Sequence, residues 1–179
     1  DAQEYIKKLC EKENMSPCKY RLPTEAEWEY SARAGSKTEL YNGKLDSKGY
    51  FESRNLDRIG WFAGNAKSTY EGGYTIRDFS KTEGFEYYKD VPDQEAGTQI
   101  VGRKEPNAWG LYDMTGNVWE WTGDWYDSGY YEKSPSTDPR GAGSGGRRVL
   151  RGGSWRSDAR HSRLSYRLIY DPGSRDNRY

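Results

Sequence analysis

The segment NAWGLYDMTGNVWEWTGDWY, residues 107–126, constrains the fold more than any other part of the chain. Large aromatic and apolar residues alternate there with Gly, Asn, Asp and Thr, a pattern typical of short strands joined by tight turns. Aromatic residues make up 15% of the whole chain, and aliphatic residues are sparse. We therefore expect a core of large rings bridged by irregular segments instead of stacked Leu and Val layers.

Two helices are expected near the N-terminus. Residues 1–13 place apolar side chains at helical spacing with Lys and Glu between them, which predicts an amphipathic helix. In RLPTEAEWEYSARAG, Thr24 and Glu27 have the spacing of a reciprocal capping box, and Gly35 can supply a left-handed stop. These signals predict a second helix over 25–34.

The chain has two cysteines, Cys10 and Cys18. Their spacing is compatible with a local disulfide in an exported chain and equally with two buried thiols. The sequence leaves both alternatives open.

The rest of the chain carries weaker signals. Residues 36–102 are rich in Gly, Tyr, Asp and Lys without a sustained period, which predicts long loops with a few short strands, and 67–99 has the character of an insertion. A Gly/Ser-rich loop then precedes a short strand around 149–151. With 179 residues, we expect one domain of the α+β class, with two helices, short irregular strands and long loops.

The charge pattern argues against two classes of partner. The formal net charge is +0 and both signs are spread along the chain, so no global field would recruit nucleic acid. The sequence also has no apolar run of membrane-spanning length and no recognisable signal peptide. We expect no nucleic-acid binding and no membrane contact by this domain.

Three segments carry long and specific motifs, namely KYRLPTEAEWEYSARAG, NAWGLYDMTGNVWEWTGDWY, and RVLRGGSW with the spaced Arg residues that follow it. Together they resemble the formylglycine-generating-enzyme (sulfatase-modifying-factor) family. The resemblance covers roughly 1–66 and 100–179. It implies the fold of that family, a variant of the C-type lectin fold.

The chain departs from the enzymes of this family where their chemistry takes place. Those enzymes carry one cysteine two residues after the aromatic residue of the GGS-aromatic motif and another five residues later, and this pair binds copper and oxidises a substrate cysteine. Ser157 and Ser162 stand at these positions here. A serine hydroxyl is hard and protonated at neutral pH, so it cannot replace a thiolate on copper(I). Other relatives hold iron with several histidines, and this chain has only His161. We therefore expect neither copper nor iron, and no catalysis.

The resemblance also implies a structural calcium ion in the segment DMTGNVWE. The matching ligands are Asp113, the backbone carbonyls of Gly116 and Val118, and Glu120. Hard oxygen ligands of this kind suit calcium. Alternatively, the two carboxylates cap turns beside the neighbouring tryptophans, and in either case their role is structural.

The last 24 residues differ in composition from everything before them. Lys, Glu, Gln, Met and Trp fill 39 of the first 155 positions and none after Trp155. Randomising the adenines of an Asn codon cannot reach these same five residue types. In this respect the segment 151–179 resembles the variable proteins of diversity-generating retroelements, in which a reverse transcriptase randomises adenines at the 3′ end of a gene. Ordinary members of the family also have an Arg- and Asn-rich C-terminal segment, so family variation remains an alternative.

This second resemblance implies a function and a set of contact residues. We expect a non-catalytic protein on a bacterial cell surface or phage particle, which recognises a protein or cell-surface ligand. The run Leu168, Ile169 and Tyr170 supports a contact surface, because adjacent apolar side chains are unusual in a polar loop. An enzyme with another site and a structural paralogue in a surface or secretion complex are the alternatives. The expected contact residues are Arg156, Ser157, Asp158, His161, Ser162, Leu168, Ile169, Tyr170, Asp171, Ser174, Asp176, Asn177, Arg178 and Tyr179.

Overall fold

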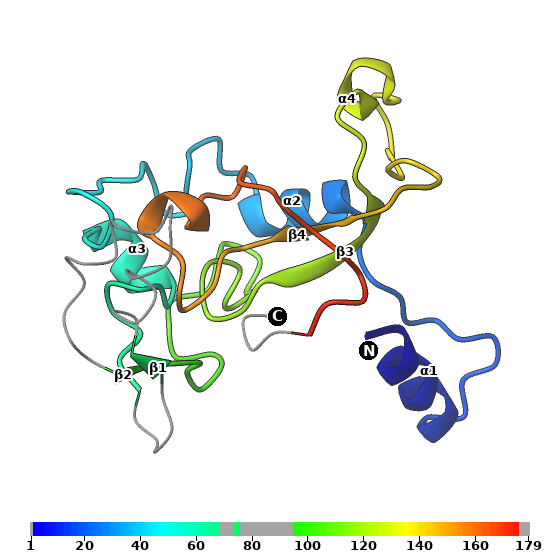
Figure 1. Ribbon diagram of the computed structural model, residues 1–179, viewed down its shortest axis with the longest axis horizontal. Coiled ribbons are helices and arrows are strands. Elements are labelled where there is room, and N and C mark those ends of the chain that lie inside the picture. The colour runs from blue at the N-terminus through cyan, green and yellow to red at the C-terminus, as the bar shows by residue number, and fades with distance from the viewer. Residues whose placement is uncertain (1, 69–73, 76–94, 176–179) are drawn as a thin grey trace.

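The computed structural model describes residues 2–68, 74–75 and 95–175 (Figure 1). Most of the expected insertion over 67–99 therefore lies outside the described residues, as do the last four candidate contact residues. Two short strands lie within this range, β1 (Tyr74–Thr75) and β2 (Glu95–Ala96), and they pair antiparallel. In the described part of the chain, no helix is both long and apolar enough to span a bilayer.

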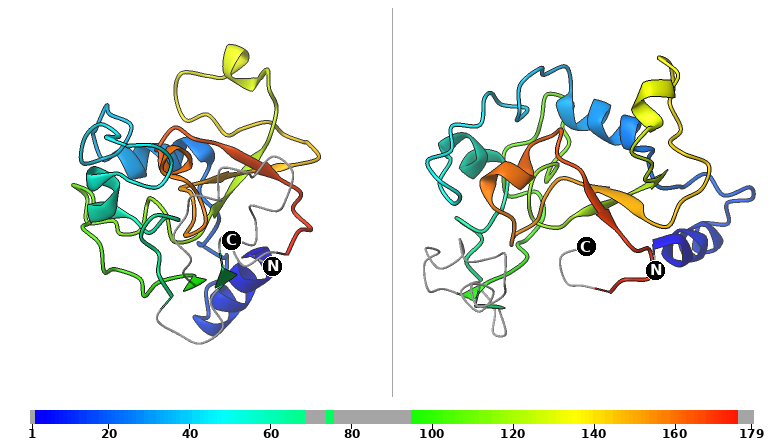
Figure 2. Two further views of the ribbon diagram at one scale, coloured as in Figure 1. Left: turned by 60° about the vertical axis from the view of Figure 1, so that its left-hand side comes forward. Right: turned by 45° about the horizontal axis from the view of Figure 1, so that its top comes forward.

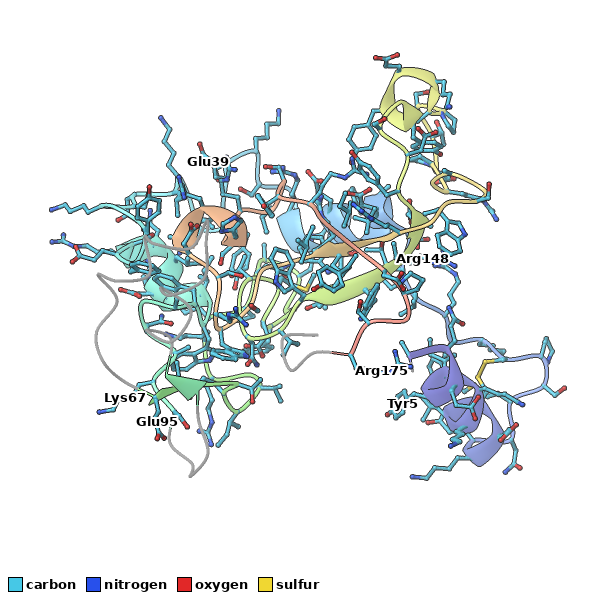
Figure 3. All side chains as sticks on the ribbon, viewed as in Figure 1. Tyr5, Glu39, Lys67, Glu95, Arg148 and Arg175 are labelled. Atoms are coloured by element: carbon cyan, nitrogen blue, oxygen red, sulfur yellow. A yellow bond between two sulfur atoms is a disulfide. The ribbon has the colours of Figure 1, made fainter. Side chains whose placement is uncertain are left out.

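Both expected helices are present. Helix α1 (Ala2–Lys12) lies at the edge of the molecule, and a disulfide links its Cys10 to Cys18 in the segment that follows (Figure 3). This bond resolves the two alternatives for the cysteines in favour of pairing. Helix α2 (Glu25–Arg33) begins with the expected capping box, in which the Glu27 amide donates to the Thr24 hydroxyl and the Thr24 amide donates to the Glu27 carboxylate.

Two further helices were not expected. Helix α3 (Arg54–Ile59) has a Ser53 side chain that accepts a hydrogen bond from the Leu56 amide, and α4 (Tyr130–Lys133) is a single turn. Leu56 and Ile59 are fully buried. A helix of six residues is too short to show a periodic pattern, so only its cap and the burial of these two side chains define it.

The central sheet has three antiparallel strands in the order β3 (Glu120–Trp125), β4 (Arg148–Arg151) and β5 (Leu168–Tyr170). Within 107–126 only β3 is a strand, and the residues before it form turns. The segment Leu168–Tyr170 was expected in a polar loop, and this expectation is wrong. It forms an edge strand beside β4, with Ile169 opposite Val149. The observed α+β architecture agrees with the expected class.

Helix α2 packs on one side of this sheet (Figures 1 and 2). Trp28 and Ala32 of α2 form a buried cluster with Met114 and Leu164. A neighbouring cluster is mainly aliphatic and consists of Leu40, Leu56, Ile59, Phe62 and Ala159. A third cluster packs the Trp155 ring among small Ala side chains with Phe51 and Trp61 beside it, so large rings contribute to the core as expected. Because all three clusters include residues of the C-terminal segment, the core directly supports that segment.

Candidate functional site

A buried ionic network ties the C-terminal segment to helix α2. The Arg151 guanidinium is fully buried and donates to the carboxylates of Glu25, at 3.0 Å, and of Glu29. Arg167 binds the same Glu25 carboxylate in a bidentate manner, at 2.5 and 2.7 Å. One carboxylate at the start of α2 thus holds two arginines from the two ends of the loop 152–166. The loop is thereby anchored on both sides.

The Gly152–Gly153 turn sets the path of this loop. Both glycines have positive φ, at 94° and 83°. A Cβ on Gly153 would lie 2.9 Å from the Ser162 hydroxyl oxygen, so a side chain there would collide with the neighbouring turn. Glycine is required here by both the conformation and the close approach.

Two buried serines occupy the positions of the family's cysteine pair. The Ser157 hydroxyl oxygen accepts a hydrogen bond from the Ser154 amide at 3.0 Å, and it lies 3.2 Å from the Ser154 hydroxyl. The Ser162 hydroxyl is fully buried and has no hydrogen-bond partner. Neither group is a thiolate, and both cysteines of the chain are bonded to each other near α1.

Asp158 organises the short 3₁₀ helix η3 (Ala159–Ser162). It is fully buried, and its carboxylate accepts hydrogen bonds from the Arg160 and His161 amides. The Nδ1 atom of His161 lies 2.9 Å from the same carboxylate, and the imidazole packs edge-on against Tyr166. Burial acts to raise the pKa of Asp158, but the side-chain hydrogen bonds of His161 and Arg160 outweigh it, so the net pKa is lowered. The carboxylate therefore stays ionised and fixes the loop.

The expected contact residues divide according to burial. Ser157, Asp158 and Ser162 are buried, so in this structure they hold the loop and cannot touch a macromolecular ligand. Arg156 and His161 are partly exposed. The other described candidates are also partly or fully exposed, namely Leu168, Ile169, Tyr170, Asp171 and Ser174. Asp176, Asn177, Arg178 and Tyr179 lie outside the described residues. The sequence did not separate these groups because burial in a loop follows no periodic pattern.

Two carboxylates expected to bind calcium lie close to each other. The Asp113 Oδ2 atom accepts a hydrogen bond from the Gly102 amide at 2.7 Å, whereas its Oδ1 atom is buried without a partner. Burial raises the pKa of Glu120 to about 7. The hydrogen bond from the Trp28 indole opposes this shift, and the nearby charge of Asp113 adds to it. A buried carboxylate oxygen with no donor, next to a second acidic group, fits a hard cation.

The backbone between these carboxylates supports the C-terminal loop. Gly116 has φ of +77°, and a Cβ there would lie 2.2 Å from the Trp61 carbonyl oxygen, so glycine is required. Its amide donates to the Gly152 carbonyl at 2.8 Å, and the Trp155 amide donates to the Asn117 carbonyl at 2.8 Å. The segment 113–120 therefore braces the turn that begins the candidate site. No group of three or more His, Cys, Asp or Glu side chains arranged for a metal occurs among the described residues, so further ligands there would be carbonyls or water.

Comparisons with known proteins agree on the type of domain. A family model, the sulfatase-modifying factor enzyme 1-like domain, matches residues 1–179. The formylglycine-generating enzyme of Streptomyces coelicolor is 38% identical over 135 residues, which make up 75% of this chain and 36% of that enzyme.

Two solved structures are similar in fold. Treponema denticola variable protein 1 has a TM-score of 0.61 and 29% identity, covering 88% of this chain and 44% of that one. PvdO from Pseudomonas aeruginosa has a TM-score of 0.66 and 25% identity, covering 98% of this chain and 54% of that one. This chain thus spans about a third of the Streptomyces enzyme's length and about half of each solved chain.

Proposed function

Because this chain belongs to the sulfatase-modifying factor enzyme 1-like domain family, we propose that it is a non-catalytic member whose C-terminal residues bind a protein or cell-surface target. The observation that carries this proposal is the chemistry at the two positions of the family's cysteine pair. Ser157 and Ser162 are buried hydroxyl groups, and Cys10 and Cys18 are bonded to each other elsewhere. Without a thiolate pair, copper(I) lacks its preferred ligands at this position.

The geometry of the loop supports a role in display. Buried groups fix its backbone, while Arg156, His161 and the strand Leu168–Tyr170 remain partly exposed. Arg and Tyr side chains provide large contact areas at modest entropic cost, and a fixed backbone limits the entropy that is lost on binding. The similarity to Treponema denticola variable protein 1 supports a diversified contact surface.

We also propose that Asp113 and Glu120, with the backbone carbonyls of Gly116 and Val118, hold a structural Ca²⁺ ion. The unpartnered Asp113 Oδ1 atom, with the acidic group of Glu120 nearby, supports a cation here. Bound calcium would balance the negative charge of these two partly buried carboxylates. It would thereby stiffen the segment that donates to the Gly152 carbonyl.

The disulfide supports an exported protein, since such bonds persist in oxidising compartments. We propose a location on a bacterial cell surface or phage particle, where a protein or cell-surface ligand is accessible. The even charge balance is consistent with a partner other than nucleic acid.

The first experiment tests diversification of the contact surface. The gene is sequenced together with its downstream flank, and the codons for 151–179 are compared with any near-copy. A copy that differs only where it carries adenine, followed by a reverse-transcriptase gene, is the expected result. A complete flank with no such copy would refute diversification. Ordinary family variation would then explain the composition of residues 151–179.

The second experiment tests the absence of catalysis. The purified domain and a Ser157→Cys/Ser162→Cys double variant are titrated with copper(I) under a competing chelator. We expect no stoichiometric copper on the wild-type chain, and the double variant serves as the matched thiol control. Tight, stoichiometric copper on the wild-type chain, with oxidation of a cysteine-containing substrate peptide, would contradict the proposal.

A further inference from the structure

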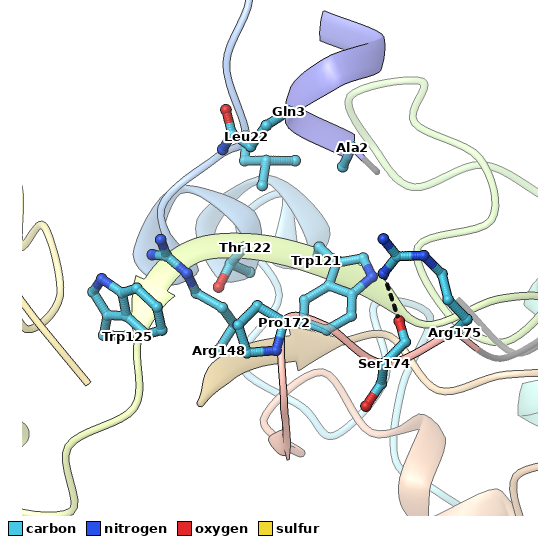
Figure 4. Close-up of a pocket in the computed structure, with 10 residues that line it drawn as sticks. All are labelled: Ala2, Gln3, Leu22, Trp121, Thr122, Trp125, Arg148, Pro172, Ser174 and Arg175. Atoms are coloured by element: carbon cyan, nitrogen blue, oxygen red, sulfur yellow. Dashed lines mark hydrogen bonds between the residues drawn. The ribbon is translucent and has the colours of Figure 1, made fainter. Parts of the chain in front are cut away.

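A groove of about 480 Å³ lies between the start of α1, strand β3 and the end of the described tail (Figure 4). No residue between 149 and 171 lines it, so it is separate from the buried serines. Its volume falls within the range of pockets that hold small ligands. The lining residues are Ala2, Gln3, Leu22, Trp121, Thr122, Trp125, Arg148, Pro172, Ser174 and Arg175.

The walls of this groove are largely apolar and include two large rings. Trp121 and Trp125 both come from β3 and are partly exposed. Leu22 and Pro172 extend the apolar surface on either side of them. Tryptophan is enriched among the residues that contribute most of the binding energy at interfaces.

Among the described residues, the charged side chains that line the groove are all of one sign. They are Arg148 and Arg175, and no described Asp or Glu lines it. Figure 4 shows Trp121 between these two arginines, with Trp125 beyond Arg148. A ligand that covers the Trp121 ring would therefore meet a guanidinium group on each side.

The Arg148 guanidinium is held in place, and both guanidinium groups keep donor capacity. Arg148 stacks 3.6 Å over the Trp125 ring and donates one N–H group to the Gly123 carbonyl. Arg175 donates to the Gly173 and Ser174 carbonyls. A guanidinium has five N–H donors in a planar fork that matches a carboxylate, so these carbonyls do not exhaust either group.

From these observations we infer that the groove binds an acidic peptide segment of a partner protein, with an apolar side chain on Trp121 flanked by carboxylates that pair with Arg148 and Arg175. The inference rests on the proposed function, since Ser174 is one of the expected contact residues, and it names the chemistry of the target. A polyanion such as nucleic acid is disfavoured, because the chain is neutral overall and the two arginines are separated by an apolar ring.

The test uses the intact domain and a capped pentapeptide, acetyl-Gly-Glu-Leu-Glu-Gly-amide, titrated by calorimetry at low salt. The matched control peptide carries Gln in place of both Glu residues. We expect saturable binding of the acidic peptide and at least tenfold weaker binding of the control, because charge-assisted hydrogen bonds are lost. Equal affinity for the two peptides, or no binding of either, would overturn the inference.

Variants then locate the binding. Arg175 lies in the exposed tail. We expect Arg175→Gln and Arg148→Gln each to lower the affinity for the acidic peptide about tenfold. Arg54→Gln, on the exposed surface of α3, is the matched control and should bind like the wild type. Peptide binding that Arg175→Gln and Arg148→Gln both leave unchanged would overturn the groove as the site.

Two further outcomes separate this inference from the proposed function. If a target binds through Arg156 and His161 while the groove variants bind it normally, the inference is overturned and the proposed function stands. A concentration-dependent dimer, measured by sedimentation and abolished by Arg175→Gln, would make a second copy the occupant and would also overturn it.

Discussion

Replacing Glu25 by glutamine tests whether one buried carboxylate anchors the C-terminal loop. Arg151 is fully buried and would lose one of its two carboxylate partners, although Glu29 remains. Arg167 would lose its bidentate carboxylate partner. Removing one partner from a buried ion pair lowers the free energy of unfolding by about 3–5 kcal/mol. Because Arg151 keeps its contact with Glu29, we expect a loss near the lower end of this range, at about 3 kcal/mol.

The loss is measured as the free energy of unfolding in urea, followed by tryptophan fluorescence. For a chain of this size, about 3 kcal/mol corresponds to a melting temperature lower by about 6–12 °C. Glu27→Gln is the matched control, since Glu27 lies on the same helix and pairs with Arg21 in an exposed bridge. Gln also preserves the capping box, so the control should cost less than about 1 kcal/mol. A Glu25→Gln variant as stable as this control would refute the anchoring role.

Three other outcomes follow from the described contacts. Adding Ca²⁺ at about 100 times its dissociation constant to chelator-treated domain should stabilise it by about 2.7 kcal/mol. Asp113→Asn should remove most of this gain, and equal calcium stabilisation of the variant would contradict the proposed ligand. Reducing the Cys10–Cys18 disulfide should lower the stability of the α1 segment by about 2–3 kcal/mol, because the bond closes a short loop. Hydrogen exchange should then speed up in α1 and stay unchanged in β4, and faster exchange in β4 would show that the bond supports the core. Because the pKa of Asp158 is lowered in the folded state, its contribution is present above the ordinary carboxyl pKa and is lost as the pH falls through the lowered value. The stability difference between the wild type and Asp158→Asn should therefore shrink in urea titrations below about pH 4, and a gap that widens there would contradict the assigned ion pair.

Local signals in the sequence were enough to predict part of the fold. The capping box of α2 and the spacing in α1 depend on residues within one or two turns of each other, so the sequence predicts them directly. The short strand near 149–151 was likewise expected and is β4. The α+β class and the serines at the two cysteine positions also follow from the order of residues alone.

Other features depend on contacts between distant segments. Leu168–Tyr170 was expected in a loop, and it became a strand because β4 offers a partner edge. The pairing of Cys10 with Cys18 was one of two open alternatives, which the distance between the folded segments decided. Helix α3 was missed because its stability comes from burying Leu56 and Ile59 against the rest of the core.

The candidate site shows the same division. The sequence by itself determined that hydroxyl groups stand at the two cysteine positions, since Ser157 and Ser162 cannot act as thiolates wherever they lie. Only the tertiary structure decided which candidate residues face solvent. It buried Ser157, Asp158 and Ser162. It also brought Arg151 and Arg167 together on Glu25, which lies more than a hundred positions away in the chain. Such long-range packing leaves no local pattern in the sequence, because it is set by the free energy of the whole core and not by the propensity of any one segment.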